Sequence, residues 1–434
     1  MSGPVRYVAS GGQWRALSGA ALNNTRATAP GIVSAAYDTT TDLLTVQLSV
    51  PLSNGGSAIT GYTVVATPQG GGVVQYASSS GMNLAVTNLI MGVTYAITAY
   101  ATNAGGNGTA SAATMVAVPM KTYVKPQTHN TGIPRGMPGD SRTPAPALTP
   151  VTGLEFEDII QATNGNVTIQ NYEITGAFNL RRDDITFRNC YFTSNQGTQG
   201  DSLFPLIVAG GSPAASRVNF VDCEFNGNGL NQIDPQGDLT QGFGLSEPCN
   251  LVTQNHLRSN IYSFVDGFRN TDNGRYESCY VHDLVYFWTQ TDSTHNDGFQ
   301  FVGEVDNMMV IGCNFELATS PYLSSILQVN ALSAPGSYRT RISIVHNWWQ
   351  GGGYYVISGY PDVVNEEISM VFAHNRFSLQ SGAEQIWYPQ DDWRIALNQG
   401  KLTLVNNVWD ATGTTTGGLQ VTENSLIPVP ELNG

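Results

Sequence analysis

The sequence has few charged residues: only 12% of its 434 residues are Asp, Glu, Lys or Arg, against a usual share of about 25%. Lys and Arg number 19 and Asp and Glu number 33, which gives a net charge of −14. No Lys/Arg-rich run occurs. The electrostatic attraction that holds proteins on phosphate backbones is therefore missing, and nucleic acid is not expected as a partner.

Long apolar runs are also absent. No stretch approaches the roughly 18 consecutive apolar residues of a membrane helix, so membrane insertion is not expected. The first residues, from Met1 to Tyr7, lack the apolar core of a signal peptide. What is abundant instead is Gly (47 residues), together with Asn, Thr, Ser and Val, a composition that favours β-structure.

The five cysteines include no Cys-x-x-Cys pair, and their number is odd. A zinc site needs ligands at short spacing, and a disulfide framework needs paired cysteines. We therefore expect neither a metal site nor a disulfide-rich fold, and nothing in the sequence indicates a cofactor.

The chain begins with residues 1–29, which show little periodicity and are expected to form an arm that docks on a partner. Strand-like segments separated by turns fill residues 30–119. Residues 44–50 alternate apolar and polar positions, as a half-buried strand does. A turn follows at Ser53–Gly56, and a second strand-like segment leads to a Leu89–Gly92–Tyr95 spacing.

These turns and this spacing resemble the fibronectin type III domain. The resemblance implies a β-sandwich in which Tyr95 occupies the tyrosine corner, with its hydroxyl reaching back to the backbone. Leu48 stands where the family usually has a core Trp. Such modules act as spacers or adhesive units, and none of these residues suggests chemistry.

Residues 120–150 are rich in proline and have no hydrophobic periodicity. Prolines occur at positions 126, 134, 138, 144, 146 and 150. This density predicts an extended, semi-stiff linker.

From about residue 151 a pattern of eight residues recurs: apolar-x-apolar-x-polar-(Cys or Asn)-x-apolar. Its copies begin at Val167, Ile185, Val218, Gly274, Met308, Ile342, Met370 and Leu402. The longest interval leaves room for one weaker coil around Leu251–Ile261. A recurrent period of roughly 30 residues is typical of a solenoid.

The apolar residues at the first and third places share one face of a strand, and those at the sixth and eighth places also point inward. The alternation therefore slips by one residue between them, which requires a corner. Strand, corner and strand, repeated, predict a parallel β-helix. Its sixth places would form an internal ladder of Tyr172, Cys190, Cys223, Cys279, Cys313, Asn347, Asn375 and Asn407. The cysteines are interpreted as packing residues. The corner residues His346 and His374 are not expected to be metal ligands.

Residues 151–418 resemble the pectate-lyase-type right-handed β-helices of bacteriophage tailspikes and carbohydrate-active enzymes. The predicted fold class is thus all-β: an N-terminal arm, a fibronectin type III β-sandwich and a right-handed parallel β-helix, with residues 419–434 as a tail. The pattern is specific for the fold and unspecific for the function.

Two neighbouring coils carry Asp-Gly-Phe, at Asp266 and at Asp297, 31 residues apart. One strand spacing would place the carboxylates about 5 Å apart, which suits a retaining glycosidase with His295 as an acid or base. Further acids or bases nearby are His282, Asp283 and Asp292. The alternative is that both Asp side chains lie at an inward corner and accept hydrogen bonds from turn amides.

Binding residues are expected on the outward face. Arg269, Gln300 and Gln328 fall on the same place of three successive coils and predict an exposed polar column. The aromatic residues considered with this column are Trp288, Trp387 and Tyr388. Aromatic rings beside amide and guanidinium groups suit sugars. Alternatively, these aromatic side chains pack loops onto the rod or bury an oligomer contact.

Three functions remain open. Extracellular modules without an export signal are consistent with a virion that leaves by cell lysis, and the resemblance implies a bacteriophage tail fibre or tailspike-like adsorption protein. It would bind other virion proteins through residues 1–29 and host-surface polysaccharide through the β-helix, and a homotrimer is favoured by the same resemblance. The alternatives are a polysaccharide depolymerase that uses Asp266 and Asp297, and a non-catalytic capsid or tail decoration.

Overall fold

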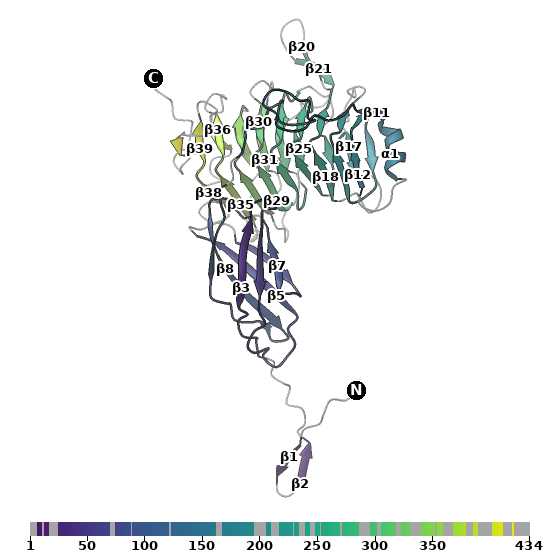
Figure 1. Ribbon diagram of the computed structural model, residues 1–434. Helices are drawn as coiled ribbons and strands as arrows, with labels where there is room; N and C mark the ends of the chain where they lie inside the picture. Colours follow the sequence, from purple (N-terminus) through teal and green to yellow (C-terminus); the bar gives the residue numbers. More distant parts are fainter. Residues whose placement is uncertain are drawn as a thin grey trace. The chain divides into compact units, whose positions relative to one another are not determined.

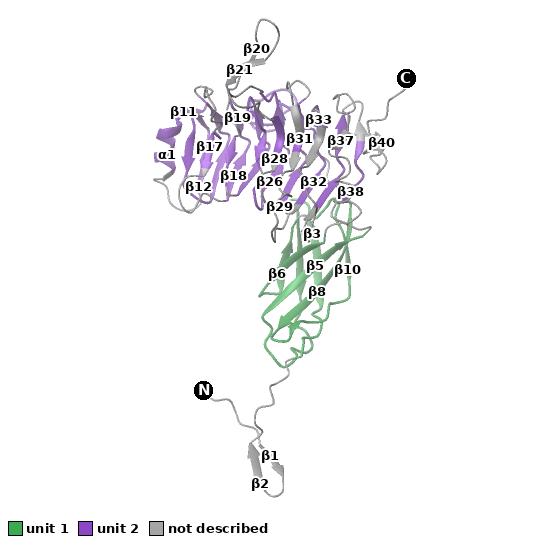
Figure 2. Cartoon of the chain, turned by 180° about the vertical axis from the view of Figure 1, so that it is seen from behind, with its two compact units in different colours: residues 1–121 green, residues 122–434 purple. Residues whose placement is uncertain are grey.

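The computed structural model divides into two compact units, residues 1–121 and 122–434 (Figure 2). The residues that the structure describes are 7–10, 13–16, 25–69, 74–87, 89–120, 123–161, 167–194, 205–209, 217–228, 230–233, 239–243, 248–251, 253–269, 271–285, 296–301, 305–317, 323–329, 340–351, 354–358, 368–378, 385–388, 402–410 and 419–420.

The first unit is a β-sandwich of antiparallel strands. One sheet has the order β3-β4-β7, and the other has the order β10-β8-β5-β6, with β9 paired to β8. These strands are β3 (Ile32–Asp38), β4 (Leu43–Leu48), β5 (Gly61–Pro68), β6 (Gln75–Ser79), β7 (Asn83–Val86), β8 (Thr94–Asn103), β9 (Gly106–Asn107) and β10 (Thr114–Ala117). The predicted arm contains a separate hairpin of β1 (Tyr7–Ser10) and β2 (Gln13–Ala16).

Alternation of apolar and polar residues explains why these segments form strands. In β8 every second side chain is buried, including Tyr95, Ile97 and Ala99. The Tyr95 hydroxyl accepts a hydrogen bond from the Ile90 amide at 2.8 Å, as predicted for the tyrosine corner. Burial raises the pKa of Tyr95 to about 12. Leu48 is buried where the family usually has Trp.

The second unit is a solenoid of parallel strands in three sheets (Figure 1). Sheet 1 contains β11 (Thr149–Thr152), β13 (Tyr172–Thr175), β16 (Tyr191–Thr193), β19 (Glu224–Asn226), β24 (Asn260–Tyr262), β27 (Tyr280–His282), β30 (Asn314–Glu316), β33 (Trp348–Gln350), β36 (Arg376–Ser378), β39 (Val408–Asp410) and the antiparallel β40 (Leu419–Gln420). Sheet 2 contains β12 (Val167–Gln170), β15 (Ile185–Arg188), β18 (Val218–Val221), β23 (Gln254–Leu257), β26 (Arg275–Glu277), β29 (Val305–Ile311), β32 (Thr340–Val345), β35 (Ile368–Ala373) and β38 (Leu402–Val405).

Sheet 3 has two parts, one ordered β14-β17-β22 and the other β25-β28-β31-β34-β37. Its strands are β14 (Phe178–Leu180), β17 (Ile207–Ala209), β22 (Cys249–Asn250), β25 (Phe268–Arg269), β28 (Asn296–Phe301), β31 (Leu323–Val329), β34 (Tyr354–Ser358) and β37 (Gln385–Tyr388). A hairpin of β20 (Leu230–Ile233) and β21 (Leu239–Phe243) is inserted between β19 and β22. The parallel β-helix predicted from the repeat is therefore confirmed.

The corner between sheets 2 and 1 is formed by the fifth place of the repeat. The residues there adopt left-handed backbone conformations with φ between 48° and 63°: Asn171, Asn189, Asp222, Arg258, Ser278, Gly312, His346, His374 and Asn406. One left-handed residue turns the chain and reverses the parity of the following side chains. This is why the first, third, sixth and eighth places all face inward.

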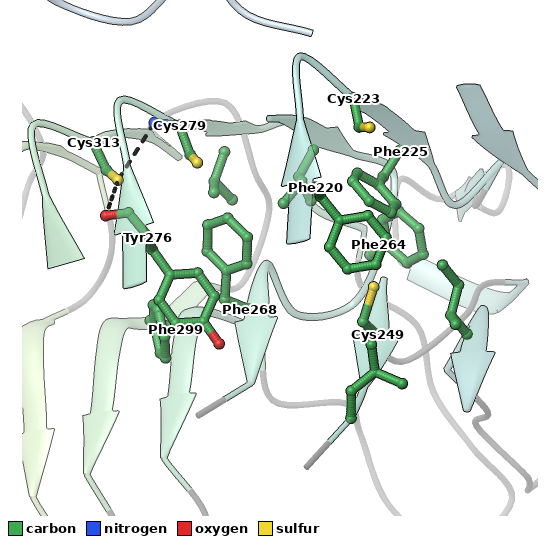
Figure 3. Packing of buried hydrophobic residues seen from close by; sticks show 14 of the residues in the cluster. Phe220, Cys223, Phe225, Cys249, Phe264, Phe268, Tyr276, Cys279, Phe299 and Cys313 are labelled. Carbon is green, nitrogen blue, oxygen red and sulfur yellow. Dashed lines mark hydrogen bonds between the residues drawn. The ribbon is translucent and has the colours of Figure 1, made fainter. Parts of the chain in front are cut away.

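The sixth-place residues form the predicted ladder inside the rod. Cys190, Cys223, Cys279 and Cys313 are buried and form no disulfide bonds, and Figure 3 shows Cys223, Cys279 and Cys313 beside the aromatic residues of the core. The ladder then continues with asparagines. Their side-chain amides bond the backbone of neighbouring coils, as when Cys313 N donates to Asn347 Oδ1 at 2.8 Å.

An extra coil occupies the longest interval of the repeat, at β23 and β24. Its inward places carry Gln254, His256 and Ser259, all buried, where other coils have apolar residues, Cys or Asn. The repeat is hard to recognise at this coil because polar residues stand at the positions that define the pattern.

One helix, α1 (Gly153–Gln161), was not predicted. Thr152 and Glu155 form a capping box, in which the Thr152 amide donates to Glu155 Oε2 at 3.0 Å. Phe156 and Ile160 are buried in the core of the rod, where Phe156 meets Phe178 edge to face at 5.5 Å. Among the described residues, no helix has the length and apolar character needed to cross a membrane.

The proline-rich segment differs from the expected linker. Residues 123–148, here called the strap, pack on the β-helix (Figure 1, blue). The Gly132 amide donates to the Arg258 carbonyl at 2.7 Å, and Ile133 is buried. Proline removes helix and sheet alternatives, but the side chains between the prolines find partners on sheet 1 and its corner.

Candidate functional site

The predicted carboxylate pair lies inside the rod. Asp266 and Asp297 have exposed fractions of 5% and 0%. The Asp297 amide donates to Asp266 Oδ1 at 2.9 Å, and the Gly267 amide donates to the Asp297 carbonyl at 2.9 Å. This arrangement supports the corner interpretation and not the glycosidase, because a polysaccharide cannot reach buried carboxylates. His295, Asp292 and Trp288 lie outside the described residues.

The parallel strands of sheet 3 place the residues of the predicted column in register with one another. Arg269 pairs with Gln300, and Gln300 pairs with Gln328. Arg269 Nη2 donates to Gln300 Oε1 at 3.0 Å, and both side chains are half-buried. Tyr388 continues the same line, whereas Trp387 falls on the line of Leu327. The side chains of Gln328, Trp387 and Tyr388 lie outside the described part of the chain.

A more complete cluster of functional side chains lies on the outward face of sheet 1. Each short strand there places its middle residue in the core and turns its first and third residues to the opposite face, where the third residue is half-buried and the first, except in β16, is buried. The first residues form one row and the third residues form a second, parallel row. Neighbours in these rows come from successive coils, one strand spacing apart, about 4.8 Å.

Aromatic rings stack across these rows. Tyr262 and His282 are in register, with ring centroids 5.2 Å apart and nearly parallel planes. Tyr280, two residues before His282, also stacks with the His282 ring, with ring centroids 4.3 Å apart. We call Tyr262, His282 and Tyr280 the aromatic row.

A carboxylate flanks each end of the aromatic row. The Tyr262 hydroxyl donates to Glu224 Oε1 at 2.8 Å, and the Tyr280 hydroxyl donates to Glu316 Oε2 at 2.8 Å. Glu224 is also paired with Arg135 of the strap. Burial and then the Glu224 carboxylate raise the pKa of Tyr262, and burial and then Glu316 raise the pKa of Tyr280. Both tyrosines are therefore fixed as hydrogen-bond donors.

His282 is held on both ring nitrogens. Nδ1 lies 2.7 Å from Asp283 Oδ2, and Nε2 lies 3.0 Å from Asn260 Oδ1. Asp283 has a left-handed backbone (φ 48°), which turns the chain out of sheet 1 and brings its carboxylate beside the ring. His282 and Asp283 are residue types that serve as a general acid and base. The fixed orientation of the His282 ring is equally suited to a surface that only binds a ligand.

The distance between the carboxylates of Glu224 and Glu316 bears on whether this face catalyses glycoside hydrolysis or only binds. Glu224 and Glu316 lie three coils apart along the sheet, roughly 14 Å. Glycosidases need their two carboxyl groups within about 5 to 9.5 Å. Glu224 and Glu316 therefore cannot act together as a glycosidase pair, and the face offers ring faces and hydrogen-bonding groups. Within the described residues, no three His, Cys, Asp or Glu side chains are grouped so that they could hold a metal ion.

The sequence pointed to only part of this face. His282 and Asp283 were considered as acids or bases, whereas Tyr262, Tyr280 and the two glutamates were missed. Tyr280 and Glu224 stand at the seventh place of the repeat, which alternation marks as outward. A comparison of outward places between successive coils was the signal that could have found them.

Comparison with known proteins identifies the first unit. The model of the fibronectin type III domain matches residues 28–116, so this part of the chain is a fibronectin type III domain. The solved structures with a similar segment include the twitchin kinase region from C. elegans, at 21% identity and a TM-score of 0.18. That match covers 22% of this chain and only 17% of the twitchin chain.

A second solved structure spans more of the molecule. The tailspike protein gp49 from Pseudomonas phage LKA1 is similar over 84% of this chain and 65% of its own, at 11% identity and a TM-score of 0.24. No curated protein matches the sequence.

Proposed function

We propose that this chain is an adsorption protein of a bacteriophage virion and that its β-helix binds a glycan of the host surface. The observation that carries the proposal is the aromatic row on sheet 1: the rings of Tyr262 and His282 are half-buried at the outward face, as is Glu316, whereas Tyr280 and Glu224 are buried and hold them in place. Sugar rings have apolar faces edged by hydroxyls. Stacked rings between fixed hydrogen-bonding groups are complementary to both features.

The periodicity of the rod also supports a polymeric ligand. Outward positions of sheet 1 recur at one strand spacing along the rod and carry polar or aromatic side chains, so a polysaccharide chain extended along the rod would meet such groups at regular intervals. After the aromatic row, the third-residue positions continue with Glu316 and Gln350. The column of Arg269, Gln300 and Gln328 on sheet 3 is kept as a second proposed contact, together with the residues Trp288, Trp387 and Tyr388.

Binding without cleavage is the favoured activity. The depolymerase hypothesis depended on Asp266 and Asp297, which are buried. The two glutamates of sheet 1 are too far apart for glycoside hydrolysis. The role of residues 1–29 in docking on other virion proteins, the virion location and the homotrimer belong to the same proposal.

The test measures retention of the purified protein on immobilised capsule and O-antigen polysaccharides, together with new reducing or unsaturated ends. Tyr262→Ala removes a ring and a hydroxyl from the aromatic row. We expect it to weaken retention about fivefold, since a stacked aromatic contact contributes about 1 kcal/mol. The matched control is Tyr76→Ala, which removes an exposed tyrosine from the fibronectin domain.

Two outcomes would contradict the proposal. Retention on no polysaccharide would leave a structural virion component as the better explanation. New chain ends that disappear in Asp266→Asn and Asp297→Asn variants would instead establish a depolymerase.

A further inference from the structure

The two ends of the strap are held in different ways. Its C-terminal half is anchored by Arg142, which donates to Asp222 Oδ1 at 2.7 Å and to the Gly132 carbonyl at 2.8 Å. Thr131 and Ile133 are buried in the same region. The start of the strap, residues 123–126, lies over β30 and β33. There Asn314 Nδ2 donates to the Pro126 carbonyl at 2.8 Å, and the Tyr123 ring contacts His346 at 5.4 Å.

Beneath this start lie polar atoms that the fold does not satisfy. Asn314 Oδ1, Trp348 Nε1 and His346 Nε2 find no hydrogen-bond partner in the part of the chain that the structure describes. Asn314 and Trp348 are 0% and 4% exposed. Buried polar groups are nearly always paired, because leaving one unpaired is costly. Three such atoms at one place indicate a surface built for something other than residues 123–126.

These side chains lie next to one another and in line with the aromatic row. Asn314 pairs with Tyr280 on one side and with Trp348 on the other, so the three occupy the same row of sheet 1. His346 stands two residues before Trp348, at the corner, and stacks on His374 at 4.7 Å. The surface that carries the aromatic row therefore continues beneath the strap.

We propose that Asn314, Trp348 and His346 form a subsite for one neutral, hydroxylated sugar unit, and that residues 123–126 cover this subsite until the glycan displaces them. The inference depends on the proposed glycan binding and adds a site to it. The indole and imidazole rings offer apolar surfaces for a sugar ring.

The hydrogen-bonding pattern selects the class of ligand. Asn314 Oδ1 is an acceptor and Trp348 Nε1–H is a donor, so a ligand must both donate and accept. A hydroxyl group does both. An anion satisfies only the indole, and a cation satisfies only the amide oxygen. A sugar unit without charge is therefore the ligand that completes this surface.

Displacement of the cover is feasible because the anchor lies elsewhere. Tyr123 packs directly on Gly312, because a Cβ atom at residue 312 would lie only 2.5 Å from the Tyr123 ring. Release of residues 123–126 leaves the contacts of Arg142, Gly132 and Ile133 in place. The strap would then move at its start while its C-terminal half remains bound.

The test uses oligosaccharides of increasing length, prepared by partial acid hydrolysis from the polysaccharide that the protein retains. Trp348→Phe keeps an aromatic ring and removes the N–H donor, and it should weaken the affinity for the longer oligosaccharides about five- to tenfold. Tyr123→Ala removes the ring that packs on His346 and Gly312, which loosens the cover and should strengthen the same affinity several-fold. The matched control is Trp349→Phe, which removes the same N–H from the next residue, inside the core.

The outcomes separate this inference from the proposed function. Wild-type affinity in Trp348→Phe, or an equal loss in Trp349→Phe, would refute the subsite. An unchanged or weaker affinity in Tyr123→Ala would refute the cover. In both cases the loss of binding in Tyr262→Ala would still support glycan binding, whereas a wild-type protein that binds no glycan overturns both proposals.

Discussion

His256 is the residue at which the core of the rod departs furthest from its pattern. The ring lies between those of Phe220 and Tyr276, at 4.7 and 5.4 Å, and its Nδ1 meets Ser259 Oγ at 3.1 Å. Burial lowers the pKa of His256 to about 3, because a charged imidazolium would lose its hydration among apolar rings.

This shift predicts an acid-sensitive fold. The pKa of an unfolded histidine is about 6.5, so the folded state binds its proton more weakly than the unfolded state. The contribution of the neutral ring to stability is complete above about pH 6.5 and declines as the pH falls from there towards 3. Chemical denaturation at pH 7, 5.5 and 4.5 measures it. His256→Phe should flatten the pH dependence, whereas His129→Gln, outside the core, should leave it as in the wild type; equal slopes in all three proteins would contradict this account.

At the scale of the element, each coil of the rod is joined to the next by side chains as well as by strands. Asn375 accepts a hydrogen bond from the Asn347 amide at 3.0 Å through Oδ1, and its Nδ2 donates to the Ile344 carbonyl at 2.8 Å. The cysteines at equivalent places fill the same inward position with a smaller, softer group, as Cys313 does beneath Asn347. The second half of the ladder thus depends on paired amides.

Substitutions of Asn375 test this dependence. Asn375→Leu should lower the free energy of unfolding by about 2–4 kcal/mol, because it leaves buried backbone groups without partners. Asn375→Cys introduces the residue that occupies this place in the first half of the ladder, and it should lower the free energy of unfolding by less. Denaturant titration of the two variants gives the comparison, and a leucine variant as stable as the cysteine variant would show that shape and not hydrogen bonding holds these coils.

At the scale of the whole molecule, the strap is attached to the rod by ion pairs around Asp222. Asp222, at a corner of the rod, lies between Arg142 of the strap and Arg258. Burial alone would raise the pKa of the Asp222 carboxyl, but its bonds with Arg258 and then Arg142 hold it below the ordinary value. These ions are partly shielded from water, so their interaction is stronger than that of surface pairs.

Arg142→Gln should therefore destabilise the second unit by about 3 kcal/mol, since it leaves a buried carboxylate with one cation fewer. The fibronectin unit makes none of these contacts and should unfold as before. Scanning calorimetry distinguishes the two transitions. Arg217→Gln, which breaks an exposed pair with Asp184, is the control and should cost at most about 1 kcal/mol. A similar loss in both variants would mean that the strap adds no stability to the rod.

Much of the architecture could be predicted from single residues. Tyr95 indicated the tyrosine corner because its spacing to Leu89 is local. The sixth-place ladder and the corner followed from alternation within eight residues. The helix α1 was missed because its only sequence signal is the capping box of Thr152 and Glu155, in a segment whose surroundings favour strands. The extra coil was nearly missed because its inward residues are polar.

The sequence by itself determined the two kinds of fold, because alternation, turn residues and the repeat act between neighbours in the chain. Only the tertiary structure decided which side chains of different coils meet, since loops of unequal length separate them. It buried Asp266 and Asp297, brought Tyr262, His282 and Tyr280 together between two carboxylates, and packed the proline-rich segment on the rod. Each of these depends on long-range burial and register, which alternation within a single strand does not determine.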